Sequence, residues 1–448
     1  MKRRNILSFL LAAVMIFSAC SAASAAQAAR KMETAADAEQ WIRIFLGEDP
    51  GSLEGEWAMT AQMEAAAARL GGIEGMAASL SMLGDVVEIG SVYETQLQGY
   101  QAFCVPCVFS AMSVNLVLAT ENGAIAGLST GPYSKGTEEA AVSDDFDSID
   151  LALPVPAQNG ELPGTLTVPK GDGPFPAVIL VHGSGPSDRD ETIVGIKPFR
   201  DLAEGLAAKG IAVYRYDKRT YVYGKQMADD REITLEDETI EDAVNAVHLL
   251  SEQERIDPGR ICVLGHSLGG NAIPAIAREL EDSGEKACGF ILMAASPRPL
   301  DVLMREQYDF LYSLMPEVTE EQQAEKDGIF AELDRLQNLD EMSEEDTVLG
   351  IFPPYWKWLA QYDVLETAQE ITAPCLLLQG EEDYQVTMED FSMWKEALGD
   401  KENWQMISYP GLTHLFTPGQ KSEGADAYAR EAKVDAQVIE DIAEFISR

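Results

Sequence analysis

The chain has 448 residues, a hydrophobic fraction of 46% and a formal net charge of -42 at pH 7, with a pI near 4.3. At about 150 residues per domain, this length suggests two or three domains, and the composition is too polar for a protein that crosses a membrane many times. So acidic a surface repels the phosphates of DNA and RNA, which excludes nucleic acid as a partner.

Residues 1–26 have the pattern of an export signal. A basic start precedes an apolar run from Ile6 to Phe17, and small residues continue to Ala26. The run is too short for a comfortable transmembrane helix. Residues 17–20 resemble a bacterial lipobox, with Phe where Leu is usual, which favours a lipid on Cys20 as the only membrane tether. The alternative is ordinary cleavage near Ala26 and free secretion.

Residues 27–140 are expected to form a small α+β domain. Helical patterns come first and strand patterns follow, which favours an antiparallel sheet. The expected helices are about 35–46 and 56–70, the second ended by Gly71-Gly72, and the expected strands are 86–98, 100–110, 112–118 and about 125–128. This stretch contains no His, and a linker rich in acidic residues, Gly and Ser follows at about 135–148.

The chain contains six cysteines, and five of them lie beyond the export signal. Cys262, Cys288 and Cys375 lie in or beside apolar strand patterns, where a buried unreactive thiol is expected. Cys104 and Cys107 form a C-x-x-C motif, but no second pair and no nearby His accompanies it, so zinc is not expected. A local disulfide in an oxidising compartment stays open for this motif, although plain packing is favoured.

From residue 149 to the end at 448, apolar strands alternate with helices. A hairpin is expected from 151–155 and 164–168, joined by a turn at 158–160. The further strands are 177–181, 212–216, 260–264, 289–294 and 375–379, and the helices are 197–209, 235–251 and 269–280. This alternation indicates a parallel sheet covered on both faces.

The long interval before the strand at 375 breaks this rhythm. It is helical, acidic and rich in aromatic residues, and it is too long for a simple crossover. We therefore expect an inserted cap from about 299 to 370. The aromatic run at 352–358 is expected either to line an acyl or aryl pocket or to pack the cap on the core, and the sequence does not choose between these roles.

Ser267 is the candidate nucleophile. It lies in Gly265–Gly269, which fits G-x-S-x-G directly after an apolar strand and at the start of a helix. A sharp strand-to-helix turn of this kind lifts the hydroxyl above the sheet, and the flanking glycines leave room for it. The N-terminus of the following helix favours developing negative charge.

A serine hydroxyl needs a base, and the chain has only four histidines. His266 is the chain neighbour of Ser267, His182 ends a strand and His248 lies within a helix, so His414, in a loop before the last helix, is the candidate base. The base needs a carboxylate to hold its tautomer. Asp383, after an apolar strand and a Gly turn, is preferred over the neighbouring acidic residues Glu381 and Glu382.

The segment 182–186 (HGSGP) follows the strand at 177–181. A Gly-rich turn there lets backbone N–H groups face a substrate. We expect an oxyanion hole made of the N–H of Leu268 together with that of Ser184 or of Gly183.

At these segments the sequence resembles the bacterial α/β-hydrolase esterases that carry a cap. The resemblance rests on HGSGPSDRDET at 182–192, RYDKR at 215–219, GHSLGG at 265–270, and the contexts of Asp383 and His414. It covers about residues 150–448 and implies the α/β-hydrolase fold and hydrolysis of carboxylic esters. The order Ser, Asp, His along the chain is the order of this family. Residues 27–140 resemble, by position, a small domain that often precedes exported hydrolases.

The resemblance also bears on the charged residues near the site. Asp217, Lys218 and Arg219 fit the strand-end motif of the family and are interpreted as structural charge pairs, and residues 188–190 are expected to order the loop beside the oxyanion hole. One departure is the stretch 220–224, which is more aromatic than the usual Gly-rich turn.

The expected reaction is acyl transfer through a covalent intermediate on a small-molecule ester, with no metal or organic cofactor. Three alternatives stay open. The first is a serine peptidase of the prolyl-oligopeptidase type, although the internal repeats of its usual propeller are absent from the sequence. The second is an acyltransferase, although such relatives usually carry Cys where this chain has Ser267. The third is an exported binding protein whose hydrolase domain has lost its activity.

Overall fold

The computed structural model describes residues 29–97, 99–110, 113–132, 143–156, 160–228 and 230–448. These residues divide into two compact units. The first holds the chain up to Ala141 with the segments Ile193–Gly195 and Val222–Asp229, and the second holds the rest. The predicted export signal, including Cys20, lies outside the described residues. Within them, no helix is both long and apolar enough to span a membrane.

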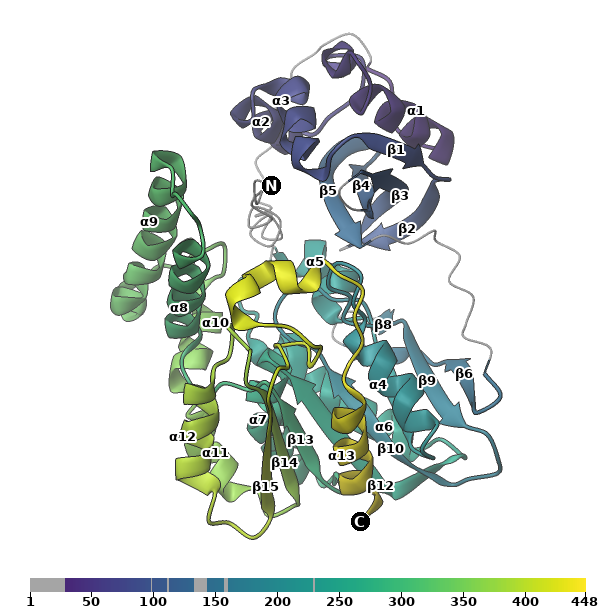
Figure 1. The fold of residues 1–448 in the computed structure, drawn as a ribbon, viewed down its shortest axis with the longest axis vertical. Helices are drawn as coiled ribbons and strands as arrows, with labels where there is room; N and C mark the ends of the chain where they lie inside the picture. The colour runs from purple at the N-terminus through teal and green to yellow at the C-terminus, as the bar shows by residue number, and fades with distance from the viewer. Residues whose placement is uncertain (1–28, 98, 111–112, 133–142, 157–159, 229) are drawn as a thin grey trace. The chain divides into compact units, whose positions relative to one another are not determined.

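The first unit contains helices followed by an antiparallel sheet, as expected (Figure 1). Its helices are α1 (Ala35–Phe45), α2 (Ala61–Arg69) and α3 (Gly72–Ser79). Its strands are β1 (Val86–Ile89), β2 (Tyr93–Leu97), β3 (Tyr100–Phe109), β4 (Ser113–Glu121) and β5 (Ala124–Pro132). The order is β1-β3-β4-β5, with β2 also paired to β3. The single strand predicted over 86–98 is therefore two strands.

The core of the first unit lies between α1 and one face of this sheet. Trp41, Ile42 and Phe45 project from one side of α1 and pack in a cluster with Phe103 and Cys107 of β3. Cys104, three positions before Cys107, belongs to a separate cluster with Val117. Both thiols are free.

Strand geometry explains why the C-x-x-C motif is not bridged. Side chains alternate between the two faces of a strand, so positions that differ by three point to opposite faces. Burial raises the pKa of both Cys104 and Cys107 to about 11, which keeps the thiols protonated. The packing interpretation is confirmed, and a local disulfide is excluded.

The second unit is built on an eight-stranded sheet in the order β15-β14-β13-β12-β10-β11-β9-β6. Its strands are β6 (Phe146–Asp150), β9 (Gly164–Pro169), β10 (Phe175–Val181), β11 (Ala212–Tyr216), β12 (Ile256–His266), β13 (Phe290–Met293), β14 (Cys375–Gly380) and β15 (Trp404–Tyr409). The six strands from β15 to β11 are parallel, and β9 and β6 are antiparallel. The predicted mostly parallel sheet is confirmed.

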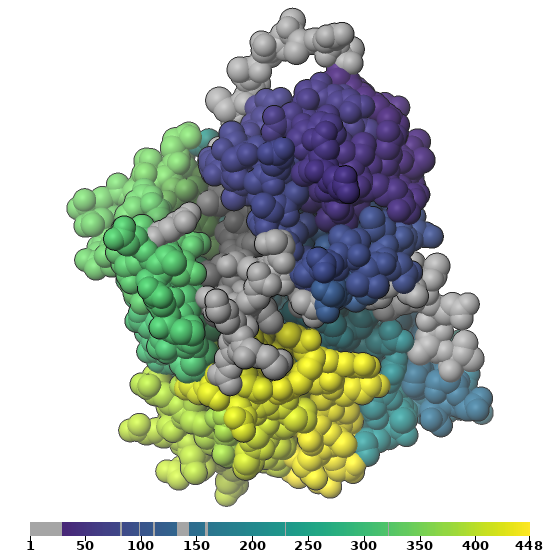
Figure 2. Space-filling view, turned by 45° about the horizontal axis from the view of Figure 1, so that its top comes forward, coloured from purple at the N-terminus to yellow at the C-terminus, as the bar shows by residue number. Residues whose placement is uncertain are grey.

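Helices cover both faces of this sheet (Figure 1). The helices are α4 (Pro198–Ala207), α6 (Glu241–Ser251), α7 (Leu268–Ser283), α12 (Met388–Leu398) and α13 (Ala436–Ser447). Helix α5 (Arg219–Ala228) is divided between the two units, because the segment Val222–Asp229 is assigned to the first. Helices α4 and α13 pack in one cluster with alternate residues of the central strands, such as Val178 and Leu180. Helices α6 and α7 contact β12. In Figure 2 the C-terminal residues, drawn in yellow, form part of the surface of this unit.

The interval expected to form a cap is helical. It contains α8 (Leu300–Ser313), α9 (Glu320–Asp334), α10 (Pro353–Gln361) and α11 (Val364–Glu370). Leu333, Val348 and Trp356 form a small hydrophobic cluster inside it. The cap therefore has apolar packing of its own.

Three details differ from the sequence predictions. The hairpin is formed by β7 (Leu153–Val155) and β8 (Gly160–Leu162), while the segment predicted as its second strand lies in the main sheet as β9. The strand β15 was not predicted. Cys262 and Cys288 form a disulfide, with Cα atoms 5.2 Å apart, because β12 and the approach to β13 are neighbours. The prediction of two free buried thiols was wrong at this pair.

Candidate active site

Ser267 lies on a strained turn between β12 and α7. Its backbone has φ 54° and ψ -116°, a conformation that residues other than glycine rarely adopt. A Cβ added to Gly265 would lie 2.2 Å from the Gly269 carbonyl oxygen, and one added to Gly269 would lie 2.4 Å from that of Val181. The Ser267 N–H donates to the Met293 carbonyl at 2.9 Å. The glycine spacing thus allows the turn that the sequence predicted.

His414 and Asp383 are paired beneath the surface. The His414 Nδ1 and Asp383 Oδ2 atoms are 2.6 Å apart, and both side chains are almost fully buried. The other carboxylate oxygen of Asp383 accepts the N–H groups of Gln385 at 2.7 Å and Val386 at 3.0 Å. Gln379 Nε2 donates to Oδ2 at 3.2 Å. A carboxylate held by four donors has the geometry needed to orient an imidazole.

The rival acids are engaged elsewhere. Glu381 accepts from the Ser408 hydroxyl at 2.8 Å, and Glu382 accepts from the Lys421 N–H at 2.8 Å. Among the residues described, no hydrogen bond joins Ser267 to His414; such catalytic bonds often tighten only when substrate binds.

The remaining histidines occupy different environments. His248 is exposed on α6, with its Nδ1 3.1 Å from Glu285. His182 is buried and its Nε2 lies 3.0 Å from the Asp188 carbonyl oxygen. Burial lowers the pKa of His182 to about 4, so this ring is neutral near pH 7. Neither is placed like His414, which agrees with the argument by elimination.

His266, next to the candidate nucleophile, joins a buried acid that the sequence analysis did not single out. Its Nε2 lies 2.9 Å from the His414 carbonyl oxygen, and its Nδ1 lies 2.9 Å from Glu191 Oε2. The second contact is off the direction of a good hydrogen bond, so it is an ion pair. The Nε2 contact requires a proton on that nitrogen, because the His414 carbonyl is an acceptor.

In this pair, each side chain shifts the pKa of the other in the direction that favours the charged form. Burial by itself would lower the pKa of His266, but Glu191 and the His414 carbonyl raise it above its ordinary value. Burial would raise the pKa of Glu191, but His266 is the largest influence that lowers it. Glu191 also has φ 51°. His266 therefore links the nucleophile turn both to Glu191 and to the His414 loop.

The same Glu191 decides between the two candidates for the second oxyanion donor. Its Oε1 accepts the Gly183 N–H at 2.7 Å, so that amide is engaged. Among the described residues, the Ser184 N–H has no protein acceptor. The Leu268 N–H is the first of α7 and has no partner within the helix. The geometry therefore favours Ser184 with Leu268.

Charged residues in the last part of β11 and directly after it hold the loop that contains these amides. Asp217 forms a bidentate pair with Arg189, at 3.0 Å for each bond, and Arg215 pairs with Asp190. The Lys218 Nζ donates to the Gly183 carbonyl at 2.8 Å. The structural interpretation of the RYDKR run agrees with these contacts, and Lys218 touches the backbone of the oxyanion loop itself.

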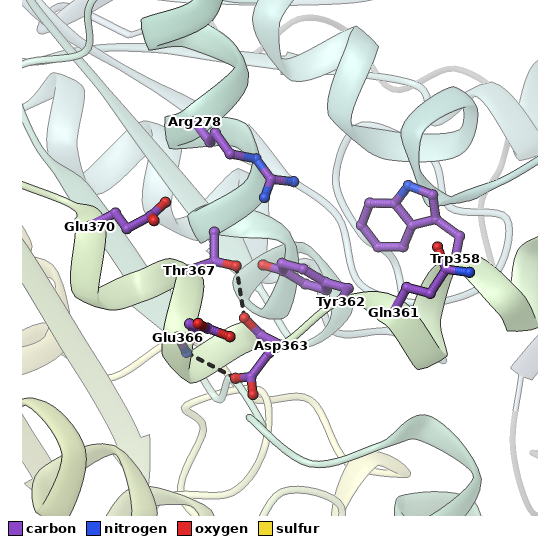
Figure 3. Close-up of a pocket in the computed structure, with 8 residues that line it drawn as sticks. All are labelled: Arg278, Trp358, Gln361, Tyr362, Asp363, Glu366, Thr367 and Glu370. Atoms are coloured by element: carbon purple, nitrogen blue, oxygen red, sulfur yellow. Dashed lines mark hydrogen bonds between the residues drawn. The ribbon is translucent and has the colours of Figure 1, made fainter.

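A separate cavity of about 340 Å³ lies between the cap and α7 (Figure 3). It is lined by Arg278, Trp358, Gln361, Tyr362, Asp363, Glu366, Thr367 and Glu370. The Tyr362 hydroxyl donates to the Asn271 carbonyl at 2.9 Å. None of the candidate catalytic residues lines this cavity.

The aromatic run at 352–358 of the cap mainly packs against other side chains. Trp356 lies in the cap cluster, and Tyr355 is buried with its hydroxyl 2.6 Å from Glu238 Oε2. Trp358 lines the cavity of Figure 3. In the part of the chain that the structure describes, no group of three or more His, Cys, Asp or Glu side chains could hold a metal ion.

A family model described as hydrolase 4, serine aminopeptidase S33, matches residues 174–418, more than half of the chain, and this range contains Ser267, Asp383 and His414. The chain belongs to the α/β-hydrolase family. The esterase EstD of Thermotoga maritima is 37% identical to this hydrolase over 377 residues, which cover 82% of this chain and 84% of EstD.

Two solved structures are similar to the hydrolase at lower identity. The Pyrococcus furiosus esterase Pf2001 is 18% identical with a TM-score of 0.42, covering 68% of this chain and 91% of that one. Est1E from Butyrivibrio proteoclasticus is 17% identical with a TM-score of 0.43, covering 67% and 99%.

Proposed function

We propose that this hydrolase cleaves carboxylic esters through a covalent acyl-enzyme. The Ser267 Oγ attacks the ester carbonyl while His414 takes its proton, and Asp383 orients His414 and stabilises its charged form. The ester C–O bond then breaks, and His414 passes the proton to the leaving alcohol. A water molecule activated by His414 attacks the acyl-enzyme, which releases the acid and restores Ser267.

The oxyanion of each tetrahedral intermediate is held by the N–H groups of Leu268 and Ser184. Donors aimed in advance at developing charge stabilise a transition state without further reorganisation. The N-terminus of α7 adds a favourable dipole at the same place.

One observation carries the proposal: a serine lies in a strained turn between a parallel strand and a helix, and its chain neighbour His266 contacts His414 of the buried His-Asp pair. The strain at Ser267 persists because the surrounding glycines and the Met293 hydrogen bond hold it. The ester as substrate class is supported by the 37% identity to EstD over most of both chains. The chain is accordingly an esterase of the α/β-hydrolase family.

The test is turnover of p-nitrophenyl esters of graded acyl length by the wild type and by Ser267→Ala. Loss of a triad serine lowers kcat by about a millionfold in a related mechanism on another fold. We expect ester turnover that collapses in the variant, and the chain-length profile measures the acyl pocket. Equal rates in both proteins would show that Ser267 is not the nucleophile.

A peptidase is the second candidate, because the matching family model is described as a serine aminopeptidase. The same triad cleaves amides. Amino-acid arylamides measured beside the esters decide between the two. Turnover of arylamides in the absence of ester turnover would replace the ester proposal.

We also propose that the protein is exported, with a lipid on Cys20 as its membrane tether. The basic and apolar pattern of residues 1–26 supports this, and so does the Cys262–Cys288 disulfide, since such bonds persist mainly in oxidising compartments. Mass spectrometry of the native N-terminus tests it. A diacylated Cys20 is expected, whereas a free N-terminus near Gln27 would indicate secretion without a lipid.

A further inference from the structure

Lys218 is a buried cation that the charge pairs of the RYDKR run do not explain. It follows β11 and is only 2% exposed. Its Nζ contacts the Gly183 carbonyl oxygen at 2.8 Å and Glu238 Oε1 at 2.5 Å. A buried ammonium is costly unless it is paired and hydrogen-bonded. Here one of the two partners is a backbone group of the oxyanion loop.

The geometry of the peptide bond gives that contact a consequence. The Gly183 carbonyl and the Ser184 N–H belong to one planar trans peptide unit, in which the two groups point in opposite directions. A cation that holds the carbonyl therefore also sets the direction of the Ser184 N–H. A Cβ built on Gly183 would lie 3.2 Å from the Ser267 Cβ, so this peptide unit lies beside the nucleophile.

The preceding peptide unit is held as well. Glu191 accepts the Gly183 N–H, so Gly183 is held on both of its sides, by an anion at its N–H and by a cation at its carbonyl. Glycine has wide backbone freedom because it lacks a Cβ. Without these two partners, the Gly183–Ser184 peptide could rotate and turn the Ser184 N–H away from the site.

The carboxylate that pairs with Lys218 is itself contacted by a residue of the cap. Glu238 lies on a π-helical turn, Glu236–Ile240, and such turns are frequent at functional sites. Its second carboxylate oxygen accepts the hydroxyl of Tyr355 at 2.6 Å, and Tyr355 belongs to α10 of the cap. Burial, followed by the Glu238 charge, raises the pKa of Tyr355 well above its usual range, so the phenol remains a donor.

We propose that Lys218 is a positioning residue that aims the Ser184 N–H at the oxyanion, with Glu238 and the cap residue Tyr355 holding Lys218 in place. The inference rests on the proposed function, because it takes the Ser184 amide as an oxyanion donor. It connects one hydroxyl of the cap, through Glu238 and Lys218, to the Gly183–Ser184 peptide unit.

The main test is Lys218→Met, which removes the ammonium and keeps most of the side-chain volume. The readouts are kcat and KM for the best p-nitrophenyl ester and the inhibition constant of a trifluoromethyl ketone with the same acyl chain, which forms a tetrahedral oxyanion on Ser267. Loss of one oxyanion donor lowers kcat by about 100- to 1000-fold. We expect a fall toward that range, a nearly unchanged KM and a parallel loss of ketone affinity.

Tyr355→Phe is the second variant, since it removes one hydroxyl and leaves the apolar cluster of the cap intact. A single hydrogen bond is worth about 2- to 12-fold, so we expect kcat and ketone affinity to fall together by a few-fold at constant KM. The matched control is Arg219→Lys. Arg219 is the next buried cation, and it pairs with Asp242 and Glu241 on α6. This control should lower stability and leave kcat unchanged.

The outcomes separate the two proposals. If the wild type has no ester turnover that depends on Ser267, the proposed function fails. If that turnover is present, but both Lys218→Met and Tyr355→Phe keep wild-type kcat and ketone affinity, the positioning role alone is overturned. Loss of stability with unchanged kcat in the folded fraction also overturns it, because a purely structural lysine would behave in that way.

Discussion

The two units of the chain differ in what they bury. In the described part of the first unit up to residue 132, the buried polar side chains are Asn115 and Thr120, and neither is charged. The second unit buries charged groups around Ser267, including Glu191, Lys218 and Asp383. Burying charge is costly, and replacing buried ion pairs by apolar residues often leaves stability unchanged or improves it. The buried charges around Ser267 are therefore better explained by chemistry than by stability.

The largest expected effect comes from Asp383→Asn. An amide at this position cannot hold His414 in the tautomer that accepts a proton from Ser267, and the same change in the serine protease triad lowers kcat by about 10⁴. We expect a loss of this order in ester kcat with a near-native melting temperature. A rate within tenfold of the wild type would mean that another acid orients His414.

The next largest effect is a loss of stability caused by a change in the first unit. Ile42→Ala empties part of the cluster under α1, and such changes cost about 2–5 kcal/mol of stability. Urea unfolding followed by circular dichroism should show the loss, while ester kcat of the folded protein stays at the wild-type value. The control is Val87→Ala, whose side chain is 66% exposed and should change little. A large fall in kcat for Ile42→Ala would show that the apolar unit takes part in catalysis.

Reduction of the Cys262–Cys288 disulfide separates stability from catalysis inside the second unit. The bond closes a loop over 26 positions, and cross-links of this kind contribute about 2–4 kcal/mol. We expect a lower melting temperature in dithiothreitol and unchanged ester kcat at 25 °C. A Cys262→Ala, Cys288→Ala double variant should be insensitive to the reductant. If the melting temperature of the double variant fell in dithiothreitol as much as that of the wild type, the effect of the reductant would not come from this disulfide.

The smallest effect is confined to acid pH. The pKa of His182 falls from 6.5 to about 4 on burial, so between these values the unfolded chain binds more protons than the folded one. Stability is therefore lost as the pH falls from 6.5 to 4, by up to about 3 kcal/mol. Asp242, whose pKa is raised to about 6 by burial, acts in the opposite sense.

His182→Gln tests this directly, because glutamine does not titrate. Stability should depend less on pH between 4 and 6.5 in the variant than in the wild type, as measured by urea unfolding at several pH values. The same slope in both proteins would show that His182 is protonated in the fold.

Much of the fold and of the candidate site could be predicted from local pattern. Ser267 could be proposed because the elbow is a local structure: its glycines, strand and helix are contiguous in the chain. The strands β10 to β14 were found because strands buried on both faces are apolar throughout. The strand β15, with only its end residues fully buried, carries a weaker pattern and was missed.

The rest depended on contacts between distant segments. The Cys262–Cys288 pair follows from the neighbouring positions of β12 and β13, and spacing along the chain does not reveal it. Glu191 is one acid among 75 acidic residues, and only its burial against His266 distinguishes it. Acidic residues on the surface and in the site look alike in a sequence, so the pattern of charges could not identify this one.

The sequence by itself determined the triad candidates, the alternation that builds the parallel sheet and the presence of a helical insertion, because each depends on residues that are close along the chain. The tertiary structure alone decided which amide of the oxyanion loop is free to meet a substrate. That choice is made by Glu191 at one side of Gly183 and by Lys218, Glu238 and Tyr355 at the other. These groups come from four separate segments. Only folding brings Glu191 and Lys218 within hydrogen-bonding distance of Gly183, and only folding places Glu238 against Lys218 and Tyr355 against Glu238.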